Sequence, residues 1–225
     1  MRGEIAQAGT LFFTLVHTPF PLVLAGDYAT ASDHADEVVL LADEKGALQW
    51  KAIGTMMQGV LMGLTGEPAG AVQRIASGIR ASSAVGSTIW MPFHLCHLAK
   101  AHAELGQLDD AWHCITEAMS TIEKTKETWC EAEVYRVAGE IALMSPESDT
   151  ARAEAYFERS LEIACEQQAK SWELRATMSM ARLWRDQGKR NEARKLLAPV
   201  YGWFAEGFDT RDLKEAKALL DELAE

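Results

Sequence analysis

A repeat of about forty residues constrains this chain more than any other feature. Its shortest form is a glycine, four residues and an alanine. The clear copies are Gly26 to Ala31, Gly66 to Ala71, Gly106 to Ala111 and Gly188 to Ala193. The segment MSPESDTARA, which ends at Ala153, fills the gap between the third and fourth of these copies. The chain is therefore expected to be a row of similar structural units.

Each position in the repeat has a physical reason. The glycine ends one helix by taking a left-handed conformation, which costs more for any residue with a Cβ atom. The alanine lies one turn into the next helix, where a small side chain lets two crossing helices approach closely. A second set of small residues precedes each turn at the same period, at Gly59, Ala99, Gly139 and Ala181. Each unit is thus predicted to be an antiparallel pair of helices.

The predicted fold is all-α, a right-handed superhelix of about five stacked helix pairs that forms one domain over residues 1–225. The expected repeats are 5–46, 47–86, 87–126, 127–169 and 170–209, followed by a capping helix at about 211–224. That last segment places five apolar residues on one helical stripe: Leu213, Ala216, Leu219, Leu220 and Leu223.

Four tryptophans recur at nearly the same spacing, at Trp50, Trp90, Trp129 and Trp172. Each falls near the start of the first helix of a predicted repeat. A ring at that place can bury a large apolar area against the preceding unit. We interpret these rings as packing residues between repeats, with stacking on a ligand as the alternative.

Composition narrows the function. The 33 acidic residues against 22 basic ones give a net charge of −11, which repels phosphate backbones, and no basic run compensates. Binding to nucleic acid is therefore not expected. The cysteines, Cys96, Cys114, Cys130 and Cys165, have no metal-type spacing and are expected to be reduced thiols of a cytoplasmic protein. The apolar stretch 11–26 contains prolines and is short for a membrane span, so neither a membrane helix nor a signal peptide is predicted.

No candidate constellation for catalysis or for a cofactor is found. The sequence lacks nucleophile-elbow, Walker A, zinc-protease and dinucleotide-binding motifs. The densest group of possible ligands is His94, His97 and His102, but this spacing does not bring four ligands together. We therefore expect no metal, no cofactor and no enzymatic activity.

The first helices of stacked helix pairs line a concave groove, which is the expected partner-binding surface. Its predicted residues change from apolar to basic along the chain: Ile53, Met56, Val60, Phe93, Lys100, Arg136, Glu140, Arg175, Met178, Arg182 and Arg185. Methionines suit an adaptable surface, and arginines on one helix face suit the carboxylates of a peptide or acidic helix. The alternative is that Met56 is packed by a neighbour and that the arginines pair with local acids.

The repeat resembles the tetratricopeptide repeat (TPR). The resemblance rests on the small residue, an apolar or aromatic position three residues later (Met62, His102, Ala142 and Trp184) and the alanine of the next helix. The period is near forty and not thirty-four, so the helices are longer. Residues 171–223, from SWELRATMSMARLWRDQGKRNEA to KEAKALLDEL, are similar to the C-terminal end of large bacterial signalling proteins. These are class III adenylate/guanylate cyclases with a P-loop ATPase module and related ATPase-type transcriptional activators.

The resemblance implies a non-catalytic protein-interaction or sensor scaffold, the regulatory repeat region of a bacterial signalling protein. An alternative function is a domain that senses a small effector, and an enzyme is a distant third. The partner is expected to be a protein or peptide in the groove. Repeat one has more apolar side chains than one neighbouring helix pair can cover, among them Phe12 and Phe13. A homo-oligomer that forms through this repeat is therefore also expected.

Overall fold

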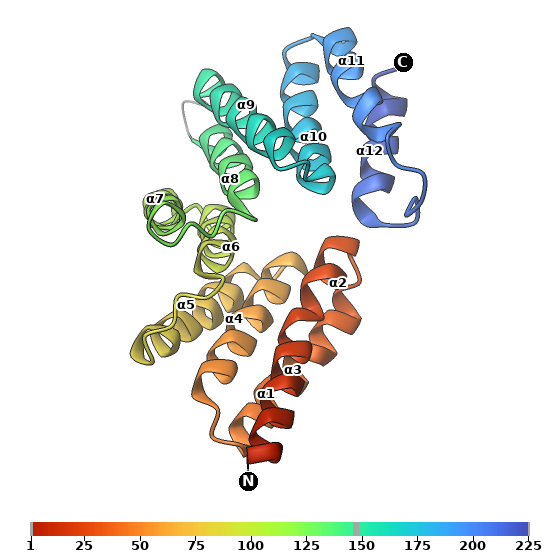
Figure 1. The fold of residues 1–225 in the computed structure, drawn as a ribbon. Helices are drawn as coiled ribbons and strands as arrows, with labels where there is room; N and C mark the ends of the chain where they lie inside the picture. The colour runs from red at the N-terminus through yellow and green to blue at the C-terminus, as the bar shows by residue number, and fades with distance from the viewer. Residues whose placement is uncertain (1, 146–148, 225) are drawn as a thin grey trace. The chain divides into compact units, whose positions relative to one another are not determined.

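The computed structural model describes the backbone of residues 2–145 and 149–224, and the side chains of residues 10–145 and 149–224. Helices and the turns between them make up these described parts, and no strand occurs there. The predicted all-α fold is confirmed (Figure 1). Contacts within the chain define two compact units, residues 1–107 and 108–225. The single domain expected from the sequence stays a prediction.

The N-terminal unit contains the first predicted repeats. Its helices are α1 (Arg2–His17), α2 (Pro19–Ala25), α3 (Tyr28–Glu44), α4 (Leu48–Leu64), α5 (Pro68–Ala84) and α6 (Met91–Glu104). Neighbouring helices in the chain pack on one another, and α4 also contacts α6. Pro19 begins α2, directly after the break at Thr18. A new helix can begin at this residue because proline at the first helical position needs no amide donor.

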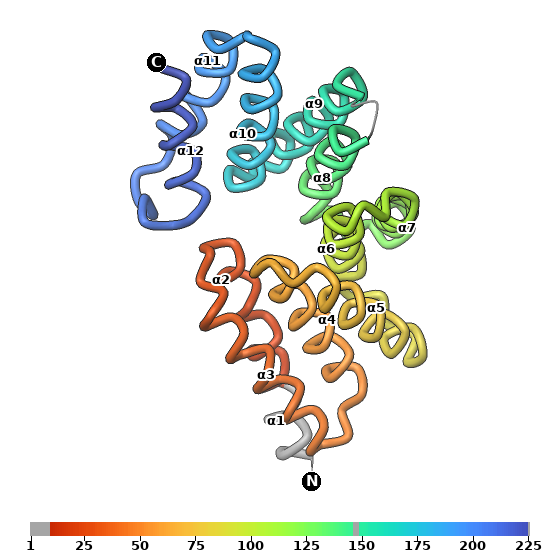
Figure 2. The backbone as a smooth tube through the Cα atoms, turned by 180° about the vertical axis from the view of Figure 1, so that it is seen from behind, coloured from red at the N-terminus to blue at the C-terminus, as the bar shows by residue number. Residues whose placement is uncertain are grey.

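The C-terminal unit continues the helical array and ends in the cap. Its elements are α7 (Leu108–Thr125), α8 (Glu131–Met144), α9 (Thr150–Glu166), α10 (Lys170–Asp186), α11 (Arg190–Tyr201) and α12 (Arg211–Glu222). Asp149 caps α9 by accepting a hydrogen bond from the amide of Arg152 at 2.9 Å. Figure 2 shows α12 beside α10 and α11, which it contacts.

The glycines of the repeat have the predicted conformation. Gly26, Gly66, Gly106 and Gly188 have φ between 75° and 91°. At Gly26 the amide donates to the carbonyls of Leu22 and Val23, which closes α2. The pattern of glycine followed by a new helix therefore follows from the left-handed turn that each unit requires.

The small residues of the repeat lie where helices approach most closely. A Cβ atom built on Gly59 of α4 would lie 2.8 Å from the backbone nitrogen of Ile75 in α5. In the other unit, a Cβ on Gly139 of α8 would lie 2.7 Å from Cδ1 of Phe157 in α9. Both Ile75 and Phe157 are fully buried. The sequence prediction of tight crossings at these glycines is confirmed.

The capping helix covers the end of the last helix pair. Its Leu213, Ala216, Leu219 and Leu223 are buried, and Leu220 is partly buried. They join one apolar cluster with residues of α10 and α11, including Leu174, Met178 and Leu197. The predicted apolar stripe is thus confirmed, and the helix itself ends at Glu222.

Candidate functional site

The apolar part of the predicted groove is not an open surface. Ile53, Met56, Val60 and Phe93 are at most 2% exposed. Lys100 is half-buried and lines a small recess between α4 and α6. The four apolar side chains are therefore packing residues, which was the alternative interpretation of Met56.

The broken first helix contributes to the burial of Ile53, Met56 and Phe93. Leu15 and Val16 of α1 belong to one apolar cluster with Ile53 and Met56 of α4. Farther along, the ring of Phe20 in α2 lies 5.2 Å from the ring of Phe93 in α6. Helices α1 and α2 thus cover residues that a repeat array would otherwise leave open. The sequence pattern missed this, because it places residues by repeat position and does not show what the terminal helix packs on.

A run of aromatic rings continues from this contact to the surface. Ring centroids are 4.0 Å apart for Phe13 and His17, 4.7 Å for His17 and Trp90, and 4.8 Å for Phe20 and Trp90. We call Phe13, His17, Phe20 and Trp90 the aromatic face. Phe13 is 58% exposed, and the other three side chains are partly exposed. The rings pack with the tilted and edge-on geometry that aromatic pairs prefer.

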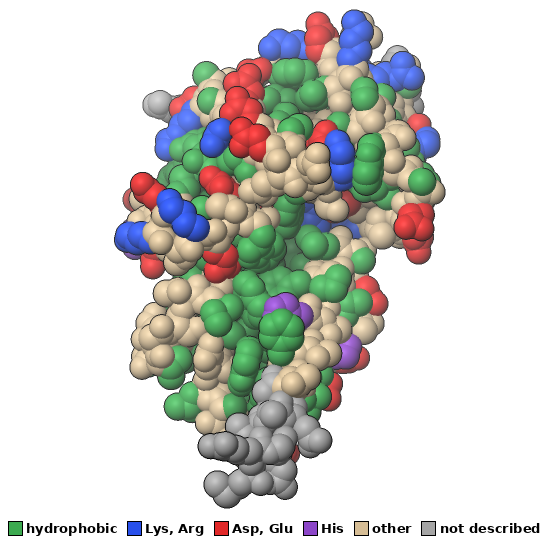
Figure 3. Space-filling view, viewed as in Figure 1, with side chains coloured by type: hydrophobic (Ala, Val, Ile, Leu, Met, Phe, Trp, Pro, Cys, Tyr) green, Lys and Arg blue, Asp and Glu red, His purple; other side chains and the backbone are tan. Residues whose placement is uncertain are grey.

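The aromatic face lies in parts of the sequence that lack acidic residues, lysine and arginine. None of these occurs from residue 5 to 26 or from 81 to 99. Figure 3 shows hydrophobic side chains gathered on the visible face of the N-terminal unit, whereas charged side chains are denser on the C-terminal unit. Trp90 also has a left-handed backbone with φ of 55°, an unfavourable conformation for a residue with a Cβ atom. This backbone holds the indole against His17 and Phe20.

The basic part of the predicted groove is a network of ion pairs. Arg136 of α8 is 8% exposed and donates to both carboxylate oxygens of Glu133, at 2.7 and 2.8 Å. Its guanidinium also donates to Glu140 and to Oγ of Ser179 in α10. Arg136 and Glu140 are thus brought together as an internal pair, because a buried guanidinium must satisfy its donors within the protein.

The arginines of α10 pair with the capping helix. Nε of Arg175 donates to Asp212 at 2.5 Å, Arg182 donates to Glu215 at 3.1 Å, and Arg185 donates to Glu222 at 3.0 Å. Met178 is buried in the apolar cluster below them. We call Arg175, Arg182 and Arg185 the arginine face. Pairing with local acids was the alternative interpretation of these residues, whereas the partner-binding groove itself stays a prediction.

The histidines that sequence reasoning considered as ligands do not form a metal site in the described structure. Within residues 10–145 and 149–224, no group of three histidine, cysteine or acidic side chains is arranged to hold a metal ion. His94 is fully buried, and neither ring nitrogen has a hydrogen-bond partner. Burial lowers the pKa of His94 to about 3 because the apolar surroundings disfavour the charged imidazole. His102 bonds to Oε1 of Gln107 at 2.7 Å.

The cysteines are free thiols, three of them buried. Burial raises the pKa of Cys114 to about 11 and raises that of Cys130 further. A thiol with a raised pKa is a poor nucleophile at neutral pH. The described helices also include none that is long and apolar enough to cross a membrane.

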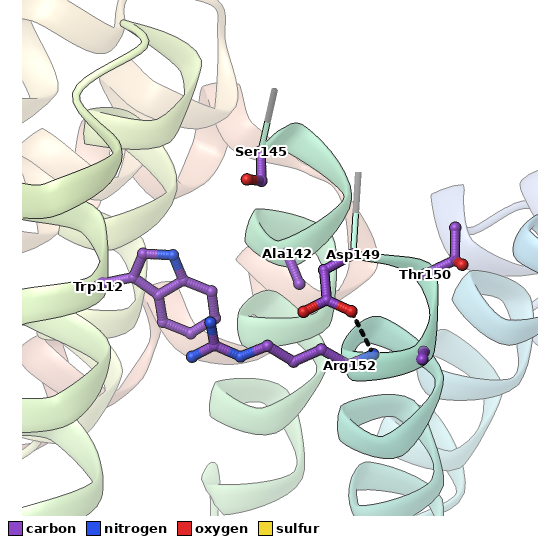
Figure 4. Close-up of a pocket in the computed structure, with 7 residues that line it drawn as sticks. Trp112, Ala142, Ser145, Asp149, Thr150 and Arg152 are labelled. Carbon is purple, nitrogen blue, oxygen red and sulfur yellow. Dashed lines mark hydrogen bonds between the residues drawn. The ribbon is translucent and has the colours of Figure 1, made fainter. Parts of the chain in front are cut away.

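Two clefts in the C-terminal unit could hold a small molecule. One, of about 350 Å³, lies between Trp112 and the start of α9. Figure 4 shows Arg152 extended beneath the Trp112 ring, with its guanidinium carbon 4.0 Å from the ring centroid. The second, of about 460 Å³, is lined by apolar and polar residues of α7 and α8, among them Met119, Ile122, Glu123 and Tyr135.

No family model and no curated protein sequence matches this chain. Solved structures with a similar fold do exist. The TPR-like repeats of a Podosopora anserina kinesin light chain match over 93% of this chain and 94% of that one, with a TM-score of 0.54 and 13% identity. A single-substitution variant of the same repeats matches over 84% of this chain and 92% of that one, with a TM-score of 0.56 and 15% identity. The chain therefore has the TPR-like helical-repeat fold of an α-solenoid.

Proposed function

We propose that this chain is a non-catalytic scaffold that binds other proteins, and that its aromatic face is an interaction surface. The observation that carries the proposal is the exposure of Phe13 at the end of a run of packed rings. Exposed apolar patches on folded proteins mark interaction sites more often than chance. Aromatic side chains are also enriched at protein interfaces, where they supply a large contact area.

A second copy of the chain fits this surface. Two copies with a net charge of −11 each repel one another, and the repulsion is least where the meeting surfaces carry no charge. The aromatic face is such a surface. A two-fold contact buries the same patch on both copies. This supports the homo-oligomer expected through repeat one. The contact involves Phe13 and not Phe12, because Phe12 is buried against Trp50 within its own unit.

Molar mass in solution tests this proposal. The wild-type chain at tens of micromolar should elute as a dimer or larger species in size exclusion coupled to light scattering. Phe13→Glu should give a monomer because two buried carboxylates would face each other. Leu40→Glu, at a site on α3 that is 65% exposed, is the matched control and should keep the wild-type mass. A monomeric wild type, or equal masses for all three chains, would exclude self-association through this face.

The wider context is a proposal of its own. The likeness of residues 171–223 to the end of bacterial cyclases and ATPase-type activators suggests a regulatory repeat region in a cytoplasmic signalling protein. A sensor of a small effector is the second candidate function, favoured by the 460 Å³ cleft between α7 and α8. A pocket of this size is large enough for a small organic ligand.

A further inference from the structure

The C-terminal unit already holds an acidic amphipathic helix on its arginine face. The three ion pairs join α10 to α12 in the same order along both helices: Arg175 to Asp212, Arg182 to Glu215 and Arg185 to Glu222. The two helices therefore run in the same direction there. The first and last paired residues lie ten positions apart on each helix, about 15 Å, whereas the middle pair is offset, because Arg182 follows Arg175 by seven positions and Glu215 follows Asp212 by three.

Beneath the charges, α12 contributes a leucine stripe. Leu213, Leu219 and Leu223 are buried in one cluster with Leu174 and Met178 of α10. A polar rim of arginines around an apolar centre is the usual anatomy of a surface that binds an amphipathic helix. The surface thus contacts both the acids and the leucines of α12.

The charged rim of the contact between α10 and α12 is partly exposed to solvent. The ion pairs of Arg182 and Arg185 are only partly buried, and such pairs contribute little to stability and are screened by salt. Between α11 and α12 lies the loop 202–210, in which Trp203 and Phe208 are exposed. Phe204 of this loop packs against the apolar cluster, so the ionic rim, and not the loop, is the weakly held part of this contact.

We propose that the arginine face binds an acidic amphipathic helix of a partner protein in place of α12. The ligand has carboxylates at the positions of Asp212, Glu215 and Glu222 and leucines at the positions of Leu213 and Leu219. This proposal rests on the scaffold function and names a partner chemistry for it. The arginine face belongs to the C-terminal unit, whereas Phe13 belongs to the N-terminal unit. A negative result at the arginine face therefore does not affect the test of self-association through Phe13.

A peptide of residues 209–224 with a fluorescent label is the probe. Its anisotropy should rise and saturate with the full wild-type chain. A peptide with Glu215→Lys and Glu222→Lys should lose about tenfold or more in affinity, because it places cations against Arg182 and Arg185. This comparison uses the same folded protein, so a change in stability cannot explain it.

Two variants of the full chain complete the test. Glu215→Lys with Glu222→Lys in the chain should loosen the resident helix and strengthen binding of the wild-type peptide, because the competing helix is removed from the site. Arg182→Glu with Arg185→Glu should weaken that binding about tenfold, whereas Arg194→Glu, exposed on α11, should not. Circular dichroism checks that each variant is folded.

Three results would overturn the proposal. The first is no saturable binding of the peptide to either the wild type or the variant with the loosened helix. The second is binding that is equal for the native and the charge-reversed peptide. The third is a dimer of the wild-type chain that is lost in the variant with Arg182→Glu and Arg185→Glu. That result would show that the arginine face binds α12 of a second copy and not a helix of a partner protein.

Discussion

Trp172 donates a hydrogen bond from its indole Nε1 to the backbone carbonyl of Trp129 at 2.9 Å, with the two ring centroids 6.5 Å apart. The two residues lie one repeat period apart in the sequence. Trp172 is buried, whereas Trp129 is partly exposed. The indole of one repeat thus binds the start of the preceding one, which is the packing role expected of these tryptophans.

Trp172→Phe should therefore lower the free energy of unfolding by about 1–2 kcal/mol, because it leaves the carbonyl of Trp129 without its donor. Trp203→Phe is the control, since Trp203 is 60% exposed, and should change stability by less than about 0.5 kcal/mol. Chemical denaturation of the three chains measures both. Equal midpoints for the two variants would remove the structural role of this hydrogen bond.

Gly59 and Gly63 allow a comparison of two glycines on α4. Gly59→Ala should destabilise the chain by about 1–3 kcal/mol, because its Cβ would lie 2.8 Å from the backbone of Ile75. Gly63→Ala meets only the Cβ of Ala71, at 3.4 Å. That replacement should be neutral or raise stability by up to about 1 kcal/mol through helix propensity. Thermal unfolding distinguishes them, and wild-type stability in the Gly59→Ala chain would place the tight crossing elsewhere.

The buried ion pairs of Arg136 should matter far more than those on the surface. Arg136→Met removes the two hydrogen bonds that the buried Glu133 accepts from Arg136 and leaves it a longer ion pair with Arg175, at 3.8 Å. The change should therefore cost about 3–5 kcal/mol. Arg159→Met breaks an exposed pair with Glu162 and should cost about 0–1 kcal/mol. Denaturant titrations of both variants check this. If they lose the same stability, the network around Arg136 is solvated and is not part of the core.

His94 should make the chain sensitive to acid. Its folded pKa of about 3 lies below the usual value of 6.5, so the unfolded chain binds a proton over a range where the folded chain does not. Stability should therefore fall as the pH drops below about 6.5, by up to about 1.4 kcal/mol per pH unit from this group. The fall ends near pH 3, where the folded chain also binds the proton.

His94→Leu removes this proton linkage and the two ring nitrogens that lack partners. Its melting temperature should vary less between about pH 7 and pH 5 than that of the wild type, and its stability at the lower pH should be higher. Parallel pH profiles for the two chains would mean that other groups account for all of the acid dependence.

Much of the fold follows from the sequence because the repeat is local. Gly66 and Ala71 mark one turn and one crossing, and equivalent pairs recur along the chain. The exposure of the individual groove residues could not be predicted in this way. Whether Met56 is open depends on Leu15 and Val16 of α1, and whether Arg182 is available depends on Glu215 of α12. These contacts are made by the first and last helices, α1 and α12, and the spacing of the repeat does not specify what those helices pack on.

The exposed residues of the aromatic face were also only partly predictable. The sequence shows that repeat one is rich in apolar side chains, but it does not separate Phe12, which is buried, from Phe13, which is exposed. The position of Trp90 beside His17 depends on a left-handed backbone at Trp90 itself. No glycine occupies this position, so the usual local signal for a left-handed turn is missing.

Hydrogen–deuterium exchange at several protein concentrations tests the central claim most directly, because it maps where the chain makes contact. Amides in segments 10–20 and 85–93 should exchange more slowly at tens of micromolar than at high dilution, whereas those of α3 around Leu40 should not change. In Phe13→Glu the difference should vanish. Exchange in segments 10–20 and 85–93 that does not depend on concentration, or slower exchange elsewhere in the chain instead, would contradict the assignment of the aromatic face as an interaction surface.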